Sequence, residues 1–93
     1  MSEILKNVDN RENKIPDPTI LLNRITFNPR VMVGKPTIRG LRITVEQILK
    51  ALSANISVQE LLEDYPELEL EDIKASLLYA AELINSEQVF EVA

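Results

Sequence analysis

The second half of the chain carries apolar residues with the period of an amphipathic helix. From Thr44 onward they recur at spacings of three and four positions: Val45, Ile48, Leu49 and Leu52. Thr44-Val45-Glu46-Gln47 fits a capping box, in which the Thr hydroxyl and the Gln side chain satisfy backbone N–H groups at a helix start. Asn55 stands where a left-handed residue ends a helix. The pattern predicts a first helix from Thr44 to just before Asn55.

Two further helices follow in the pattern. Ser57-Val58-Gln59-Glu60 repeats the capping box and Pro66 ends the segment, so a second helix is predicted over residues 57–65. The third is predicted from Leu70 to Asn85, because acidic residues at its start are favoured by the helix dipole. Its predicted buried stripe is Leu70, Ile73, Leu77, Ala80 or Ala81, and Ile84. Since Leu78 and Leu83 widen this face, we expect burial on more than one side or contact with a second subunit.

The segment before these helices reads as extended chain with turns. Ile25-Thr26-Phe27 alternates apolar and polar residues before Asn28-Pro29, which is typical of a strand followed by a turn. Both glycines of the chain, Gly34 and Gly40, lie nearby and predict positions of positive φ. The residue before Pro36 is expected to be extended. We therefore predict a short hairpin or arm around Pro36-Thr37-Ile38.

The N-terminal residues are harder to interpret. The apolar run Ile20-Leu21-Leu22 fits either a strand or a helical turn. Pro16-Asp17-Pro18 predicts a linker or turn without helix. The expected organisation is a flexible segment over residues 1–18, a domain over 19–86, and a tail over 87–93.

These elements predict a mainly α fold: a three-helix, helix-turn-helix-like bundle preceded by a short β-hairpin or arm. At 93 residues the chain supports one domain with a modest core, which self-association would stabilise. We expect a homodimer.

Composition narrows the chemistry. The chain has no cysteine and no histidine, which excludes disulfides, thiolate or imidazole metal ligands, and Ser-His or Cys nucleophiles. No apolar run is long enough to span a bilayer, and the first ten residues lack the apolar centre of a signal peptide, so we expect a cytoplasmic protein. Seven carboxylates from Glu60 to Asp72 are of the residue type that binds magnesium, but they follow two adjacent helix ends instead of converging in a cleft. We expect no enzyme activity and no cofactor or metal.

The net charge is −5, and the charged residues are distributed unevenly along the chain. Residues 24–50 carry six cations against Glu46 alone, whereas residues 51–93 carry Lys74 against ten carboxylates. Such a split predicts that a basic front segment and an acidic helical body bind two partners of opposite charge. The predicted nucleic-acid-binding residues are Arg24, Arg30, Lys35, Arg39 and Arg42. The predicted partner-binding residues are Glu60, Glu63, Glu71, Val89 and Phe90.

Residues Asn23 to Ala81 resemble family 433 of the domains of unknown function (DUF433). The motifs that carry the resemblance are Arg24-Ile25, Asn28-Pro29, the run from Gly34 to Ile43 (G-K-P-T-I-R-G-L-R-I), Asp64-Tyr65-Pro66-Glu67-Leu68 and Glu71-Asp72-Ile73. Three positions depart from the family pattern: Val33 and Asn55 replace glycines, and Leu41 replaces a threonine. The resemblance implies a homeodomain-like three-helix protein, commonly dimeric, and similar in several members to VapB-type antitoxins that pair with a PIN-like ribonuclease toxin.

Two functional hypotheses follow. The first is an antitoxin-like regulator that binds operator DNA through the basic segment and neutralises a PIN-like nuclease partner through the acidic helices or the tail. The second is a protein interaction or assembly module that binds no nucleic acid.

Overall fold

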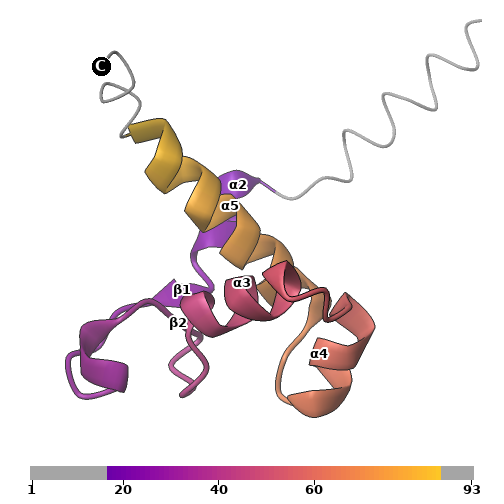
Figure 1. The fold of residues 1–93 in the computed structure, drawn as a ribbon. Coiled ribbons are helices and arrows are strands. Elements are labelled where there is room, and N and C mark those ends of the chain that lie inside the picture. Colours follow the sequence, from indigo (N-terminus) through magenta and orange to yellow (C-terminus); the bar gives the residue numbers. More distant parts are fainter. Residues whose placement is uncertain (1–16, 87–93) are drawn as a thin grey trace, which may run out of the picture.

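The structure is a computed structural model that describes residues 17–86. The elements in this range are α2 (Pro18–Leu22), β1 (Ile25–Thr26), the 3-10 helix η1 (Met32–Gly34), β2 (Thr37–Ile38), α3 (Val45–Ser53), α4 (Val58–Asp64) and α5 (Leu70–Ser86). Figure 1 shows α5 running through the molecule, with α2 beside it and the two strands, α3 and α4 gathered around its N-terminal half. The predicted class, a mainly helical fold with a short β-hairpin, is confirmed.

The two short strands form an antiparallel pair. Ile25 lies opposite Ile38 and Thr26 opposite Thr37. The hydroxyl oxygens of the two threonines are 3.0 Å apart, and the Gly40 N–H donates to Thr26 Oγ1 over 2.8 Å. The connection between the strands is a lobe that contains η1, which is longer than a tight hairpin turn.

Left-handed backbone shapes this lobe and the turn after β2. Gly34 and Gly40 have φ of 77° and 75°, as predicted. Val33 also lies in this region at φ 58°, which is unfavourable for a β-branched residue. Arg39 at φ 46° precedes Gly40 in a turn closed by a 2.7 Å hydrogen bond from the Leu41 N–H to the Ile38 carbonyl.

The helix starts agree with the predicted capping boxes. Thr44 Oγ1 accepts from the Gln47 N–H over 3.0 Å, and Ser57 Oγ accepts from the Glu60 N–H over 3.1 Å. Asn55 has φ 71°, so the predicted left-handed residue after the first helix is confirmed. Each of these features depends on residues close in sequence.

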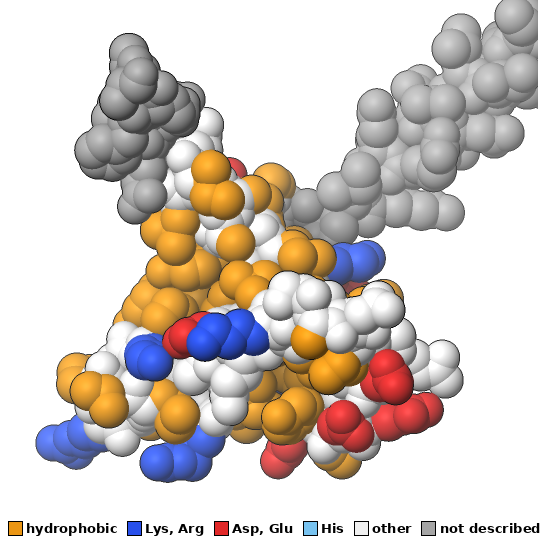
Figure 2. All heavy atoms as spheres, viewed as in Figure 1, with side chains coloured by type: hydrophobic (Ala, Val, Ile, Leu, Met, Phe, Trp, Pro, Cys, Tyr) orange, Lys and Arg blue, Asp and Glu red, His pale blue; other side chains and the backbone are white. Residues whose placement is uncertain are grey.

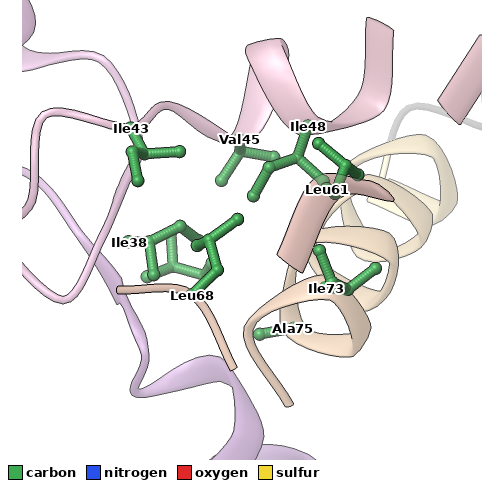
Figure 3. Packing of buried hydrophobic residues seen from close by; sticks show 9 residues of the cluster. Ile38, Ile43, Val45, Ile48, Leu61, Leu68, Ile73 and Ala75 are labelled. Carbon is green, nitrogen blue, oxygen red and sulfur yellow. The ribbon is translucent and has the colours of Figure 1, made fainter. Parts of the chain in front are cut away.

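The core lies where the hairpin, α3, α4 and the first half of α5 meet. Figure 3 shows its side chains pointing toward one another from these elements. Its buried members are Ile25, Ile38, Ile43, Val45, Ile48, Leu61, Leu68, Ile73 and Ala75. α3 contributes Val45 and Ile48, as its apolar stripe predicts.

The predicted buried stripe of α5 is wrong in most positions. Leu70, Leu77 and Ile84 are 43%, 49% and 70% exposed, and only Ile73 of that stripe is buried. The buried positions of α5 are instead Asp72, Ile73, Ala75 and Ser76. α5 is therefore rotated about its own axis relative to the prediction. α2 and β1 pack against it, and Asp72 forms buried ion pairs with Arg24 and Arg39.

The local structure at Pro18 also differs from the prediction. Pro18 is the first residue of α2, and Asp17 caps it by accepting from the Thr19 N–H over 2.8 Å. Proline is well suited to a first helical position because its missing N–H would have no partner there. The expectation of a helix-free Pro-Asp-Pro linker is therefore wrong at Pro18, and the run Ile20–Leu22 is helical.

Candidate functional site

The most highly connected polar group in the described residues is the carboxylate of Asp72, in the first turn of α5. Its side chain is fully buried. Oδ1 accepts from Arg24 Nη1 over 2.9 Å and from Arg39 Nε over 3.1 Å. Oδ2 accepts from Arg39 Nη2 over 2.9 Å and from the Glu69 N–H over 2.8 Å. A buried carboxylate is costly without partners, and here both oxygens are fully satisfied.

Strand register brings the two arginines together. Because Ile25 pairs with Ile38, the residue before β1 lies opposite the residue after β2, and the Arg39 N–H donates to the Arg24 carbonyl over 2.8 Å. Arg24 also contacts Glu69 through Nη1, at 2.7 Å from Oε1. Arg39 Nη2 donates to the Glu67 carbonyl over 2.6 Å. The hairpin is thereby fastened to the start of α5.

The ionisation of these groups follows from their contacts. Burial raises the pKa of Asp72, but hydrogen bonds from Arg39, the Glu69 N–H and Arg24 outweigh it, so the pKa lies below its usual value. Hydrogen bonds to Glu69 and then Asp72 raise the pKa of Arg24, and the hydrogen bond to Asp72 raises the pKa of Arg39. The four side chains thus form a neutral cluster of two cations and two carboxylates.

A second ion-pair group joins α3 to Lys35, the residue after η1. Glu46 contacts Lys35 through Oε1 and Lys50 through Oε2, each over 3.1 Å. The hydrogen bond from Lys50, followed by that from Lys35, lowers the pKa of Glu46. The group carries one net positive charge, and its side chains are about half to three-quarters exposed.

The five predicted nucleic-acid-binding residues therefore divide into two sets. Arg24 and Arg39 are held in ion pairs with carboxylates of the helical body, whereas Lys35 pairs with Glu46 of the basic segment itself. The expectation of a basic segment that is separate from the body therefore does not hold for Arg24 and Arg39. Arg30 and Arg42 are exposed, and within residues 17–86 neither forms an ion pair. Figure 2 shows basic side chains along the lower edge of the molecule, on the side of the hairpin.

The predicted partner-binding residues lie on two elements. Glu60 and Glu63 are exposed on α4, where the Glu60 carboxylate also accepts from the Ser57 N–H over 2.9 Å. Glu71 is half-buried in the first turn of α5. Acidic side chains gather over α4 in Figure 2. Val89 and Phe90 lie outside the described residues.

An apolar groove of about 410 Å³ lies between parts of α3 and α5. α3 contributes Leu49 and Ser53, and α5 contributes Tyr79, Ala80 and Leu83. The ion-pair group of Lys35, Glu46 and Lys50 lies along its edge. In Figure 2 this edge appears as a row of basic and acidic side chains beneath the apolar surface of α5.

Neither metal binding nor a membrane span is indicated in the part that the structure describes. Residues 17–86 contain no group of three acidic, His or Cys side chains placed to hold a metal ion. No helix in the same range is both long enough and apolar enough to cross a membrane.

The comparison with known families is decisive for residues 25–80, which match the family described as "Protein of unknown function (DUF433)". The chain belongs to the DUF433 family. A 56-residue region is 34% identical to the uncharacterized protein y4eO of Sinorhizobium fredii (strain NBRC 101917 / NGR234), covering 60% of this chain. The match spans only 25% of that relative's length. No solved structure matches the chain.

Sequence reasoning missed the role of Asp72 in this DUF433 chain. The sequence alone predicts that Arg24 and Arg39 bind nucleic acid, because both are cations in an extended segment. The strand pairing was the signal that could have revealed it. Aligning Ile25 with Ile38 places the two arginines side by side, and two adjacent cations are stable only when a nearby carboxylate neutralises them. The orientation of α5 about its own axis decides which of the acidic residues is the partner of the two arginines.

Proposed function

We propose that this DUF433 chain is an antitoxin-like, non-catalytic regulator that binds DNA and neutralises a PIN-like nuclease partner. The DNA-binding part is supported mainly by the exposed pair Arg30 and Arg42, which form no ion pair within residues 17–86. Arg30 lies in the connection between β1 and η1, and Arg42 lies in the connection between β2 and α3. Arginine is suited to contacts with phosphates because its planar guanidinium donates several hydrogen bonds and stays charged.

The nuclease-binding part is supported by the acidic surface of α4. Glu63 and Asp64 are exposed there, close to Glu67 in the turn that follows. A surface of one charge sign accelerates association with a partner of the opposite sign. The partner proposed for this surface is therefore a nuclease with a basic face.

The DNA-binding part is tested by replacing Arg30 and Arg42 with Ala together. Binding to a labelled duplex taken from upstream of the chain's own gene is measured by fluorescence anisotropy at several salt concentrations. We expect weaker binding, and a salt slope smaller by up to roughly 2, since each neutralised phosphate contributes about 0.9. Lys74→Ala is the matched control, because Lys74 is exposed on α5 and forms no ion pair among the described residues.

Unchanged affinity and slope in the double variant would remove Arg30 and Arg42 from the binding surface. Arg39 is left intact in this experiment, because its loss would expose the buried Asp72 carboxylate and confound binding with folding.

A second candidate is an interaction or assembly module without nucleic-acid binding. The observation in its favour is that Arg24, Lys35 and Arg39 already pair with carboxylates of the same chain. The two candidates differ in one measurement: the module binds a protein partner, whereas the wild-type chain shows no salt-dependent affinity for the duplex.

A further inference from the structure

The groove between α3 and α5 is lined by three separate parts of the chain. α3 contributes Leu49, α5 contributes Tyr79, Ala80 and Leu83, and Pro36 comes from the connection between η1 and β2. Leu83 is 46% exposed, and Tyr79 and Ala80 are half-buried. A volume of about 410 Å³ and an apolar lining with few polar groups are typical of pockets that bind small molecules.

The charged residues that line the groove are Lys35, Glu46 and Lys50. Each ammonium group contacts a different oxygen of the Glu46 carboxylate over 3.1 Å. The two lysine side chains are 57% and 76% exposed, and an ammonium group has three N–H donors. Both lysines therefore keep donors for a further acceptor, and this edge of the groove carries one positive charge that Glu46 does not balance.

The groove is distinct from the other exposed apolar surface of α5. Successive residues of an α-helix are about 100° apart around its axis, so Leu77 and Ile84 lie on a different face from Tyr79 and Leu83. Neither Leu77 nor Ile84 lines the groove. A ligand of the groove can therefore be distinguished from one that coats the exposed face of the helix.

We propose that the α3–α5 groove binds a small amphiphile that combines an apolar chain with one carboxylate, as a medium-chain fatty acid does. The apolar chain covers Leu49, Ala80 and Leu83, and the carboxylate accepts hydrogen bonds from the lysines at the edge. A carboxylate is favoured over a hydroxyl or an ammonium head group because it balances the positive charge of this edge. The site is independent of the proposed DNA binding, since Arg30 and Arg42 do not line the groove.

The test is a titration of the isotope-labelled full chain with decanoate, followed by the amide chemical shifts in NMR spectra. We expect saturable shifts at Leu49, Ser53 and Leu83, with one molecule bound per chain. Leu41 and Tyr65, which line a separate cavity, serve as internal controls and keep their shifts. 1-Decanol and decyltrimethylammonium, which have the same chain but no carboxylate, should bind roughly two- to fivefold more weakly, as expected for an exposed ion pair.

Two substitutions separate the charged part of the site from its apolar part. Lys50→Glu should weaken decanoate binding by roughly tenfold, because it replaces an attraction by a repulsion, and should leave 1-decanol binding unchanged. Lys74→Glu is the matched control, since Lys74 is exposed on α5 and does not line the groove. Leu83→Ser should weaken binding of both probes, and circular dichroism checks that this variant is folded.

Three results would overturn the proposal. The first is equal affinity for the three head groups, which would show that the charged edge selects nothing. The second is shifts at Leu77 and Ile84 without shifts at Leu49 and Ser53, which would place decanoate on the exposed face of α5. The third is a change of the Leu49 and Ser53 signals on dilution of the chain without decanoate, since a second copy would then fill the groove.

Discussion

Asp72 shows how one residue can fasten two parts of this molecule together. Its buried carboxylate receives four hydrogen bonds, three from the guanidinium groups of Arg24 and Arg39. Removing the charge from this buried side chain leaves two partly exposed cations facing a neutral group. The hairpin and the start of α5 are therefore expected to depend on this side chain for their mutual position.

Asp72→Asn tests this dependence. We expect the free energy of unfolding at pH 7 to fall by about 2–4 kcal/mol, less than for a fully buried pair because the arginines are partly exposed. Urea titration followed by circular dichroism measures it. Asp64→Asn is the control, since Asp64 is exposed at the end of α4 and the change should be close to neutral. Equal stability of both variants would show that the cluster contributes nothing net.

The stability difference between the wild type and Asp72→Asn is also expected to depend on pH. The pKa of folded Asp72 is lowered relative to the unfolded chain, where it is about 3.9. Its stabilisation is therefore fully present above that value and is lost as the pH falls through the folded pKa. The stability difference between wild type and Asp72→Asn should shrink below about pH 4. A difference that is constant across that range would contradict the assigned ionisation.

At the scale of elements, the helices are held at their starts by side chains and along their length by packing. α4 has only seven residues, of which Leu61 alone is buried. A helix this short is not stable by itself in water, so its cap contributes a large share of its local stability. Ser57 provides that cap together with Glu60.

Ser57→Ala should lower the free energy of unfolding by about 1 kcal/mol, because the Glu60 N–H loses its acceptor. Ser57→Asp keeps an acceptor and should remain close to wild type. Ser53→Ala controls for loss of a hydroxyl, since Ser53 lies at the end of α3 and donates only to the Lys50 carbonyl. Chemical denaturation of the three variants distinguishes the cap from general effects of serine replacement.

At the scale of the whole molecule, α5 leaves an apolar stripe uncovered. Leu70, Leu77 and Ile84 recur every seven residues on this helix and are 43–70% exposed. Residues 81–86 are all exposed. Figure 1 shows the C-terminal part of α5 extending beyond the hairpin, α3 and α4. We propose that this stripe pairs with a second copy, because an apolar face at this spacing is suited to helix–helix packing.

Light scattering at micromolar concentration should give twice the chain mass of 10.5 kDa. Leu77→Glu combined with Ile84→Glu should yield a monomer, since charge on the stripe disfavours its burial. Val33→Glu is the matched control, because Val33 is 90% exposed on η1, away from α5, and should leave the dimer intact. A wild-type monomer under these conditions would exclude the proposed pairing.

Much of the fold could be predicted because it depends on neighbours in sequence. The capping boxes at Thr44 and Ser57 and the left-handed Asn55 each require residues only a few positions apart. α5 was predicted in extent but not in orientation. Its leucines at 70 and 77 match an apolar stripe, whereas the structure buries the face that carries Asp72.

The sequence by itself determined where α3, α4 and α5 begin and end, where the two glycines turn the chain, and how charge is divided between its two halves. Only the tertiary structure decided which charges meet. Arg24 and Arg39 are 48 and 33 residues from Asp72, and strand register and the rotation of α5 bring the three together. Local hydrogen bonds select local conformation, but an ion pair over such separations forms only after packing has fixed the elements that carry it.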